Sequence, residues 1–461
     1  MPKSAPHAAS LSGLWQDAAQ RAIAYRNGIL DRRVSPEPEA PGRLTRHLGG
    51  PLPEDGVDAS QMLAELDHYG SPATMGSSGG RFFGFVIGSS LPSTVAASWL
   101  ATAWDQNTGL LVPAPATTLI EQIALEWMLE VLDLPREAGG AFVTGGQMAN
   151  FTALAAARHA VLKRMGWDVE SQGLFGAPEL PVIVGADAHS TIFKALSMLG
   201  LGRDRVLRVP IDSQGRMRPE ALPDIAGPAI VCIQHGNVNS GAFDPAGPII
   251  AWARSRNAWV HVDGAFGLWA RAAASRAHLA QGAEDADSWA TDAHKWLNVP
   301  YDCGVALVRD GVALRGAMGT GAAYLQESLV REPMQFTPEL SRRARGVEVW
   351  AALKTLGRRG VAELVERCCQ HAARFAEGLA AAGFEVLNDV ILNQVLVSFG
   401  SDEVTRGVIE RLQADGTCFC SGTLWHGRAA MRISVSSYAT TPDDVQRSLE
   451  AMKRIHTEVT T

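Results

Sequence analysis

The sequence predicts an α/β protein whose main domain contains a mostly parallel sheet, joined to a smaller α+β domain. Between about residues 141 and 309, short apolar runs alternate with stretches of helical periodicity. Most of these runs are continuously apolar, as expected for strands that helices cover on both faces. In chain order they are AFVT, PVIVGA, RVLRVP, AIVCIQ, AWVHVD, SWATD and CGVALVR. This alternation is typical of a parallel sheet with helical crossovers.

The segment before this region predicts mostly helices. Residues 11–30 predict an amphipathic helix, and the proline-rich RRVSPEPEAPG after it predicts an extended arm. A helix is predicted from about Ser60 to Gly70, and a loop or short strand over SSGGRFFGFVIGSSLPS. TLIE at 118–121 predicts a capping box that opens a helix ending before Pro135.

The carboxyl-terminal part predicts the smaller domain. GVEVWAALKTLG and VAELVERCCQHAARFAEGLAAAG have the periodicity of two long helices. EVLN, QVLVSF and AAMRISVS follow as predicted strands. We therefore predict three parts: an amino-terminal helical arm (1–90), a large α/β domain (91–365) and a small α+β domain (366–461).

Composition excludes several classes of function. The chain of 461 residues has a formal net charge of −7 and no dense run of Lys or Arg, so we expect no nucleic-acid partner. It contains no apolar run long enough for a signal peptide or a membrane span, which predicts a cytoplasmic protein without membrane contact. Six cysteines without CxxC spacing predict free thiols, and the lack of an HExxH motif predicts no metal site.

A glycine-rich turn follows the first apolar run. Gly145, Gly146 and Gln147 stand between AFVT and the predicted helix MANFTALAAARHA. Free backbone N–H groups and the positive end of the helix dipole suit a phosphate at such a turn. A tight turn between strand and helix, without a ligand, is the alternative.

Two polar residues follow later strands. His189, after PVIVGA, is placed to stack its ring on a flat heterocycle, or else is a hydrogen-bonded neighbour of a helix-capping aspartate. Asp263 closes WVHVD, where burial of a carboxylate costs free energy unless a cation or hydrogen bonds stabilise it. A protonated ring nitrogen is one such partner, and the small Gly264 and Ala265 leave room for the ring. A helix N-cap is the alternative role for Asp263.

Lys295 is the most informative residue. Lysine occurs six times in the chain, and Lys295 lies beside His294 in the apolar sequence SWATDAHKWLNVPYDCG. Burial disfavours the charged form of a lysine, and a neutral amine can form an imine with an aldehyde. A surface lysine is the alternative. A phosphate turn, a ring-stacking histidine, an acid for a ring nitrogen and an imine lysine, in order at successive strand ends, together predict pyridoxal 5′-phosphate (PLP).

These residues lie in motifs of a known family. From about Arg81 to Val308 the chain resembles the pyridoxal-dependent decarboxylases of the aromatic-L-amino-acid and glutamate decarboxylase group. TDAHKWLNVPYDCG resembles their lysine motif and HVDGAFG their pyridine-nitrogen motif. GGQMANFTAL resembles their phosphate turn, DAHSTIFKAL their stacking-histidine motif, and GNVNSGAFDP a segment near the cofactor. The resemblance implies the fold-type I architecture of PLP-dependent transferases and a homodimer, contacted by residues 1–90, with the active site at the subunit interface.

The resemblance also implies roles for individual residues. Lys295 becomes the Schiff-base lysine, Asp263 the partner of the ring nitrogen and His189 the stacking residue. The other implied cofactor contacts are Gly145, Gly146 and Gln147 at the phosphate, His294 at phosphate or substrate, Ala265 at the ring face, and Asn239, Ser240 and Asp292. The implied substrate pocket contains Phe85, Val86 and residues 107–116, beginning at Asn107.

Two departures from the family pattern bear on the reaction. Gln147 and Met148 replace the small hydroxyl residue and the acid usual in the phosphate turn. Pro333 stands where the family's mobile loop carries the tyrosine that protonates the intermediate carbon, and residues 328–350 contain no tyrosine. Tyr324, further upstream, is a substitute to consider.

The predicted reaction is decarboxylation of an L-amino acid to an amine and CO2. Phe82, Phe83 and Phe85 favour an aromatic substrate, and Arg432 either binds a carboxylate bidentately or forms a structural salt bridge. The missing loop tyrosine motivates an alternative on the same scaffold: aldehyde-forming oxidative decarboxylation–deamination, or an aldolase or transaminase reaction. A non-catalytic dimeric scaffold is the remaining alternative, although such a scaffold would need none of the lysine, aspartate and histidine.

Overall fold

The computed structural model describes residues 8–319 and 331–461, which divide into two compact units. The first unit combines the chain up to residue 85 with residues 398–431 and 439–461. The second unit comprises residues 86–397 and 432–438. Strand β12 (Arg428–Ser434) begins in the first unit and ends in the second.

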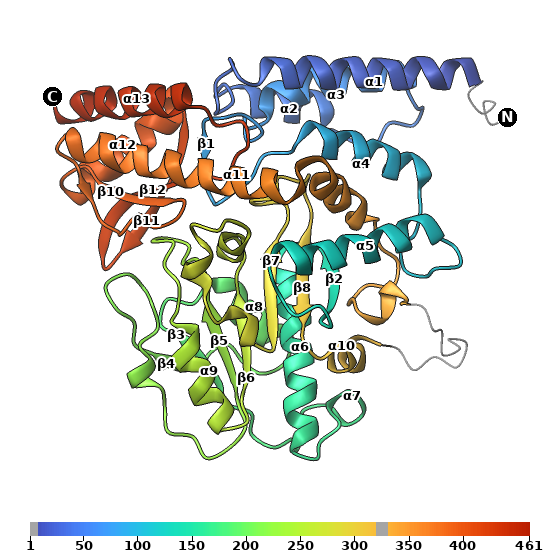
Figure 1. The fold of residues 1–461 in the computed structure, drawn as a ribbon. Coiled ribbons are helices and arrows are strands. Elements are labelled where there is room, and N and C mark those ends of the chain that lie inside the picture. The colour runs from blue at the N-terminus through green and yellow to red at the C-terminus, as the bar shows by residue number, and fades with distance from the viewer. Residues whose placement is uncertain (1–7, 320–330) are drawn as a thin grey trace. The chain divides into compact units, whose positions relative to one another are not determined.

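The second unit contains strands and helices that alternate along the chain (Figure 1). Its strands are β2 (Gly139–Val143), β3 (Val182–Gly185), β4 (Leu207–Val209), β5 (Ile230–Gln234), β6 (Trp259–Asp263), β7 (Ser288–Asp292), β8 (Gly304–Val308), β9 (Glu385–Val386) and β10 (Gln394–Ser398). Its α-helices are α4 (Pro92–Trp104), α5 (Pro115–Val131), α6 (Gly146–Arg164), α7 (Val169–Gln172), α8 (Ser190–Met198), α9 (Ala246–Ser255), α10 (Gly311–Met318) and α11 (Arg345–Ala381). Five short 3-10 helices are Pro219–Ala221, Gly267–Ala272, Ala277–Ala280, Ala283–Asp285 and Pro333–Gln335.

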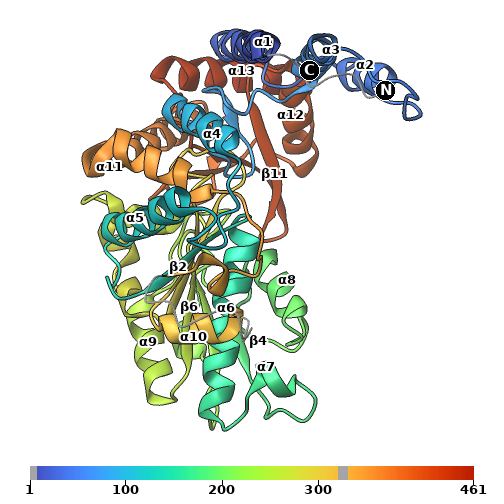
Figure 2. The same cartoon turned by 90° about the vertical axis from the view of Figure 1, so that its right-hand side faces the viewer.

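Seven of these strands form one sheet in the order β2-β8-β7-β6-β5-β3-β4. The pairs from β7 to β4 are parallel, whereas β8 runs antiparallel to both β2 and β7. Strands β2 and β7 therefore point the same way. Helices α6 and α8 lie on one side of the sheet and α9 on the other (Figure 2). The prediction of an α/β fold with a mostly parallel sheet is confirmed.

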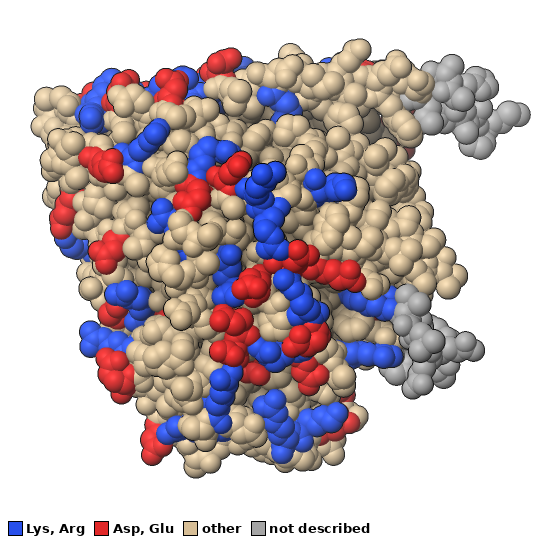
Figure 3. Space-filling view, in the orientation of Figure 1, with Lys and Arg blue, Asp and Glu red and all other residues tan. Residues whose placement is uncertain are grey.

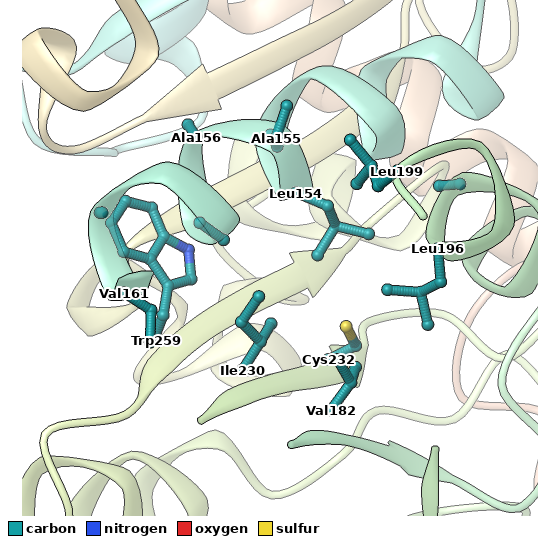
Figure 4. Packing of buried hydrophobic residues seen from close by; sticks show 14 of the residues in the cluster. Leu154, Ala155, Ala156, Val161, Val182, Leu196, Leu199, Ile230, Cys232 and Trp259 are labelled. Atoms are coloured by element: carbon teal, nitrogen blue, oxygen red, sulfur yellow. The ribbon is translucent and has the colours of Figure 1, made fainter. Parts of the chain in front are cut away.

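Helix α6 packs on this sheet through short side chains. Its alanines, including Ala153 and Ala156, are buried and let the helix backbone approach the strands closely. Leu154 and Val161 point from the same helix toward Ile230 and other strand residues (Figure 4). This tight contact fixes the amino-terminal end of α6 against the strand ends, where the predicted site residues lie.

The first unit consists mainly of helices. They are α1 (Ala8–Gly28), α2 (Ala40–Leu48), α3 (Ala59–Ala73), α12 (Asp402–Asp415) and α13 (Pro442–Thr460). Strand β1 (Phe82–Phe83) runs parallel to β11 (Phe419–Trp425), with the ring of Phe82 stacked on that of Phe419 at 5.0 Å. The buried Arg81 pairs with Asp444 at 3.4 Å, and this joins the start of β1 to the first turn of α13.

All seven predicted strands of the large sheet are confirmed, as are the strands predicted in EVLN, QVLVSF and AAMRISVS. The two long helices predicted near the carboxyl end form α11, which is broken at Gly357 by a φ of 60°. Strand β11, in the sequence FCSGTLW, was not predicted, because its burial does not follow an apolar alternation.

Two predictions about helix starts are wrong. The TLIE capping box does not exist, because α5 already begins at Pro115 and Thr118 donates instead to the carbonyl of Leu110 at 3.4 Å. The proline-rich arm is not extended throughout, because α2 begins at Ala40 with Pro41 in its first turn. A proline is tolerated there because the first N–H groups of a helix have no partner within the helix.

The compact units do not coincide with the predicted parts 1–90, 91–365 and 366–461, since the first unit joins the two ends of the chain. The three-part division stays a prediction. No helix in residues 8–319 or 331–461 is long and apolar enough to cross a membrane. Basic and acidic side chains are interspersed on the face shown in Figure 3.

Candidate active site

The predicted site residues of the second unit lie where strands end. Asp263 is the last residue of β6 and Asp292 the last of β7, with Lys295 three residues further on. His189 follows β3 and caps α8, and Gly145 joins β2 to α6. Because β2, β3, β6 and β7 all point the same way, their carboxyl ends share one edge of the sheet, where open α/β sheets bind ligands.

Lys295 pairs with a buried carboxylate. Its Nζ lies 2.9 Å from Oδ2 of Asp292, whose side chain is 2% exposed, while the lysine side chain is 20% exposed. The Oδ1 atom of Asp292 lies 3.6 Å from Nε2 of His294 and has no hydrogen-bond partner among the described residues. Burial of an anion with an unsatisfied oxygen is costly, so this carboxylate favours cationic or donating groups around it.

His294 is held by its other ring nitrogen. Its Nδ1 accepts a hydrogen bond from the backbone N–H of Cys303 at 3.2 Å, so Nε2 carries the proton and points toward Asp292. Burial lowers the pKa of His294, which keeps the ring neutral. The ring of Tyr301 lies against it, with centroids 4.3 Å apart. Burial, together with the charge of Asp292, raises the pKa of Tyr301.

The glycine-rich turn leaves no room for side chains. Gly145 has a φ of 100°, and a Cβ on Gly146 would lie 2.6 Å from Oδ2 of Asp292. No side chain of the described residues caps this end of α6, and the first N–H groups of a helix have no partner within it. Gln147 points elsewhere, since its amide contacts the sulfur of Met198 at 3.9 Å. The turn thus offers backbone donors rather than a side-chain ligand.

Asp263 is buried, with two weak donors. Its Oδ1 accepts from the backbone N–H of Ala265 and its Oδ2 from Nδ2 of Asn150, each at 3.3 Å. Burial raises the pKa of Asp263, whereas positive charges on His189 and Lys295 lower it. A cation beside the carboxylate would therefore stabilise its ionised form. Ala265 also accepts from the backbone N–H of Asp292, which ties the ends of β6 and β7 together.

His189 faces the same cavity as Asp263, lined in addition by Asp187, Cys232 and Gln234. Its Nδ1 is 2.8 Å from the hydroxyl of Thr191 and accepts from the backbone N–H of Thr191 at 3.3 Å. Burial lowers the pKa of His189, although the charge of Asp263 opposes this shift. A neutral imidazole at the wall of the cavity is thus available for stacking.

Arg432 is a further buried cation of the second unit. It lies on β12, is 9% exposed, and donates to Oδ1 of Asn239 at 3.4 Å. Burial lowers its pKa to about 10, so it remains charged at neutral pH. Its charge also contributes to the lowered pKa of His189. No carboxylate of the described residues forms an ion pair with Arg432, so none of them provides the structural salt bridge that was the alternative role. Ser240, by contrast, is structural, because its hydroxyl donates to the carbonyl of Gln214.

A buried asparagine fixes the turn that carries Lys295. The Oδ1 of Asn298 accepts from the backbone N–H groups of Ser89 and Tyr438, at 3.1 and 2.9 Å. Its Nδ2 donates to the carbonyl of Ser436 at 2.9 Å, and its own carbonyl accepts from the N–H of Leu91 at 2.8 Å. Two distant chain segments, 89–91 and 436–438, are thereby tied to the residue three positions after the lysine.

The predicted substrate-pocket residues are divided between the two compact units. Phe82, Phe83 and Phe85 belong to the first unit: Phe82 and Phe83 are buried in β1, and Phe85, 59% exposed, stacks on Phe419. Val86 is buried in the second unit.

Asn107 lines an open pocket of the second unit. The pocket has a volume of about 670 Å³, and Asp105, Arg343 and Glu348 also line it. Asn107 is bound to the neighbouring segment, because its Oδ1 accepts from the backbone N–H of Arg342 at 3.0 Å. Pro333 is buried at the start of a short 3-10 helix, and Tyr324 lies outside the described residues.

The structure adds residues that the sequence did not single out. Asn150 donates to Asp263 and to Thr191, and His261 binds Asn150. Asn298 and Tyr301 contact the turn around Lys295. All five lie within the motifs quoted above, but their roles depend on contacts with distant parts of the chain.

The residues present fit PLP. A donor-lined turn without side chains suits its phosphate, and the buried Asp263 suits a cationic ring nitrogen. The amine of Lys295 lies 2.9 Å from Oδ2 of Asp292, the carboxylate against which the turn packs at Gly146. The unsatisfied Oδ1 of Asp292 further indicates that this cluster is completed by a group with hydrogen-bond donors.

Comparisons with known proteins agree with this geometry. Residues 41–400 match the family described as "Pyridoxal-dependent decarboxylase conserved domain". The chain is 29% identical to Tryptophan decarboxylase 1 of Oryza sativa subsp. japonica, over 87% of this chain and 83% of that protein. It is 31% identical to L-2,4-diaminobutyrate decarboxylase of Rhizobium meliloti, over 89% of this chain and 85% of that protein.

A solved structure has the same fold. The crystal structure of Oryza sativa TDC with PLP and tryptamine superposes with a TM-score of 0.91 at 25% identity, covering 100% of both chains. The superposition covers both compact units of this chain.

Proposed function

Because this chain belongs to the pyridoxal-dependent decarboxylase family and is a PLP-dependent amino-acid decarboxylase, we propose that its substrate is an aromatic L-amino acid. The observation that carries the assignment of the site is the cluster of Lys295, Asp263 and His189 at one edge of the sheet. The aromatic preference is supported by the rice relative, whose name specifies tryptophan, whereas the rhizobial relative's name specifies a diamino acid.

Each member of the cluster has a distinct task toward PLP. Lys295 would hold it covalently through its amine, and the N–H groups at the start of α6, from Gly146, would bind its phosphate. Asp263 would accept a hydrogen bond from the ring nitrogen, and His189 would stack on the ring. PLP would supply an electron sink for the negative charge that loss of CO2 leaves on the substrate.

The substrate is oriented by groups of the second unit. Arg432, a buried cation without a carboxylate partner among the described residues, binds the substrate carboxylate and thereby selects the bond that breaks. His294 directs its Nε2–H into the same cluster. Asn239 holds the guanidinium of Arg432. Ala265 and Asp292 complete the proposed set of cofactor residues, and Val86 and Asn107 the proposed pocket residues. The roles of Gln147 and Phe85 stay predictions from the sequence.

A proton must return to Cα after CO2 departs, and Pro333 cannot supply one. Tyr301 is a candidate donor, because its ring lies against His294 and its raised pKa keeps the hydroxyl protonated at neutral pH. A neutral phenol next to a site residue can act as a general acid.

We further propose a cytoplasmic homodimer. Six free, buried cysteines suit a reducing compartment. Helix α4 exposes Trp99, Leu100 and Trp104, an apolar surface that a second copy of this chain would cover. Light scattering of the purified protein tests the dimer: a mass near 49 kDa, that of one chain, contradicts it.

The experiment that tests the reaction uses the full chain with PLP and a panel of amino acids in air. Products are identified by mass spectrometry, and borohydride reduction followed by peptide mapping locates the cofactor. We expect an aromatic amine, CO2 and PLP attached at Lys295. Lys295→Ala should lose the attachment and turnover, whereas Lys194→Ala, which changes an exposed lysine on α8, should keep both. Turnover by Lys295→Ala, or products from diamino acids alone, contradicts the respective part of the proposal.

A further inference from the structure

Asn150 lies one turn into α6 and connects the two residues that face the cofactor. It is 1% exposed. Its Nδ2 donates to Oδ2 of Asp263 at 3.3 Å and to the hydroxyl of Thr191 at 3.2 Å. Its Oδ1 is 2.9 Å from Nε2 of His261. One amide therefore contacts β6 twice and the first turn of α8 once.

The direction of these hydrogen bonds follows from the carboxylate of Asp263, which in its ionised form can only accept. Asn150 therefore directs Nδ2 to Asp263 and Oδ1 to Nε2 of His261. Burial lowers the pKa of His261 to about 3, so the ring is neutral and its one proton lies on Nε2, where Oδ1 of Asn150 accepts it. Nδ1 of His261 then accepts from the hydroxyl of Ser288 at 2.9 Å, and that hydroxyl accepts from the indole Nε1 of Trp259 at 2.8 Å.

This fixes the orientation of the amide. With its oxygen bound to His261, Asn150 presents only donors to Asp263 and Thr191. The reversed amide would place an oxygen against the carboxylate of Asp263 and an NH2 against the N–H of His261, which is repulsive on both sides.

The second donor of the amide reaches His189 through Thr191. Because the Thr191 hydroxyl accepts from Asn150, its proton is free for Nδ1 of His189, 2.8 Å away. The backbone N–H of Thr191 donates to the same nitrogen. The proton of the neutral His189 ring is therefore on Nε2.

We propose that Asn150 is a positioning residue that sets the hydrogen-bonding state of both cofactor-facing groups, holding Asp263 as an acceptor for the ring nitrogen and His189 in its Nε2–H form. The inference rests on the proposed roles of Asp263 and His189. It extends them to a buried chain, Trp259–Ser288–His261–Asn150, none of whose members lines the cavity shared by His189 and Asp263. Loss of Asn150 would leave a buried carboxylate with one donor in place of two.

The test compares Asn150→Ala and the similarly sized Asn150→Leu with the wild-type holoenzyme. The matched control is Thr152→Val, on the same helix, because the buried hydroxyl of Thr152 has no hydrogen-bond partner among the described residues. We expect PLP to bind about tenfold more weakly to both Asn150 variants, as for loss of one hydrogen bond to a charged group. With 15N-labelled PLP at saturation, the ring-nitrogen NMR signal should move toward the unprotonated form. Thr152→Val should match the wild type in both measurements.

The outcomes separate this inference from the proposed function. PLP attached at Lys295 together with a displaced ring-nitrogen signal in both variants supports the role of Asn150. An unchanged ring-nitrogen signal, even with a lower unfolding temperature, overturns it, because Asn150 would then contribute only to stability. Wild-type protein that carries no PLP at Lys295 overturns both proposals.

Discussion

A buried ion cluster of the second unit offers a stability test that is independent of the cofactor. Glu121, on α5, has a fully buried carboxylate. Its Oε2 accepts from Arg342 at 2.6 Å, and its Oε1 accepts from Arg331 at 3.1 Å. Both arginines also donate to backbone carbonyls, Arg331 to Gly140 and Arg342 to Thr108 and Phe142. The cluster thereby joins residues 331–342 to α5 and to β2.

The perturbation is Glu121→Gln, which keeps the shape and removes the negative charge. Two guanidinium groups would then be buried without a counter-ion, and burial already lowers the pKa of Arg331. Removing one partner of a buried ion pair costs about 3–5 kcal/mol. Two charge-assisted hydrogen bonds at about 1.5–3 kcal/mol each give a similar total. Because a glutamine oxygen still accepts one bond, we expect a loss near the lower end, about 3 kcal/mol.

Thermal unfolding, followed by tryptophan fluorescence, measures this loss. For a protein of this size, a destabilisation of about 3 kcal/mol corresponds to a fall in midpoint of roughly 3–5 °C. Glu126→Gln is the control, because Glu126 lies on the exposed side of the same helix and pairs only with Gln122 there, at 3.2 Å. It should change stability by less than about 0.5 kcal/mol. Equal midpoints for the two variants would refute the reasoning, as would a failure of Glu121→Gln/Arg331→Met to recover stability.

Two further predictions concern protonation. Tyr301→Phe should lower the rate of amine formation about 100-fold or more, as for loss of a general acid, and should raise the share of aldehyde among the products. The control Tyr69→Phe should leave the ratio of amine to aldehyde unchanged. An unchanged ratio in Tyr301→Phe would exclude Tyr301 as the donor. His235 is fully buried, and burial lowers its pKa to about 3. In the unfolded chain His235 therefore binds a proton below about pH 6.5, whereas in the folded chain it stays neutral. This difference lowers the free energy of unfolding by about 2 kcal/mol at pH 5. His235→Leu should remove that acid-dependent loss in urea titrations at pH 7.5 and pH 5, and a pH dependence equal to the wild type's would contradict it.

The fold and the main site residues were predictable because each is a local pattern. Continuously apolar runs gave the strands, and the polar residue that ended each run gave Asp263 and Lys295. The predicted start of α5 was wrong although TLIE satisfies the local capping rule. The helix begins at Pro115 instead, and the hydroxyls of Thr117 and Thr118 form hydrogen bonds with residues 108–110. That competition is set by tertiary packing.

The supporting residues could not be predicted because their roles depend on long-range contacts. Asn150 and Asp263 are 113 positions apart, and Asn239 and Arg432 are 193 apart. Nothing in the local sequence of α6 distinguishes Asn150 from a polar residue on an exposed helix face. His261 did carry a signal, since it is a polar residue inside an apolar strand, and such a residue requires a buried hydrogen-bond partner.

The contacts of Asn298 have a consequence for biosynthesis. The turn that holds Lys295 is tied to segment 89–91, which is made before the lysine, and to segment 436–438, which is made about 140 residues after it. A nascent chain that ends before residue 436 lacks half of these ties, although it already contains the lysine, the phosphate turn and Asp263. We therefore expect the cofactor to be captured only after segment 436–438 has been made, so that a chain truncated before this segment does not sequester PLP.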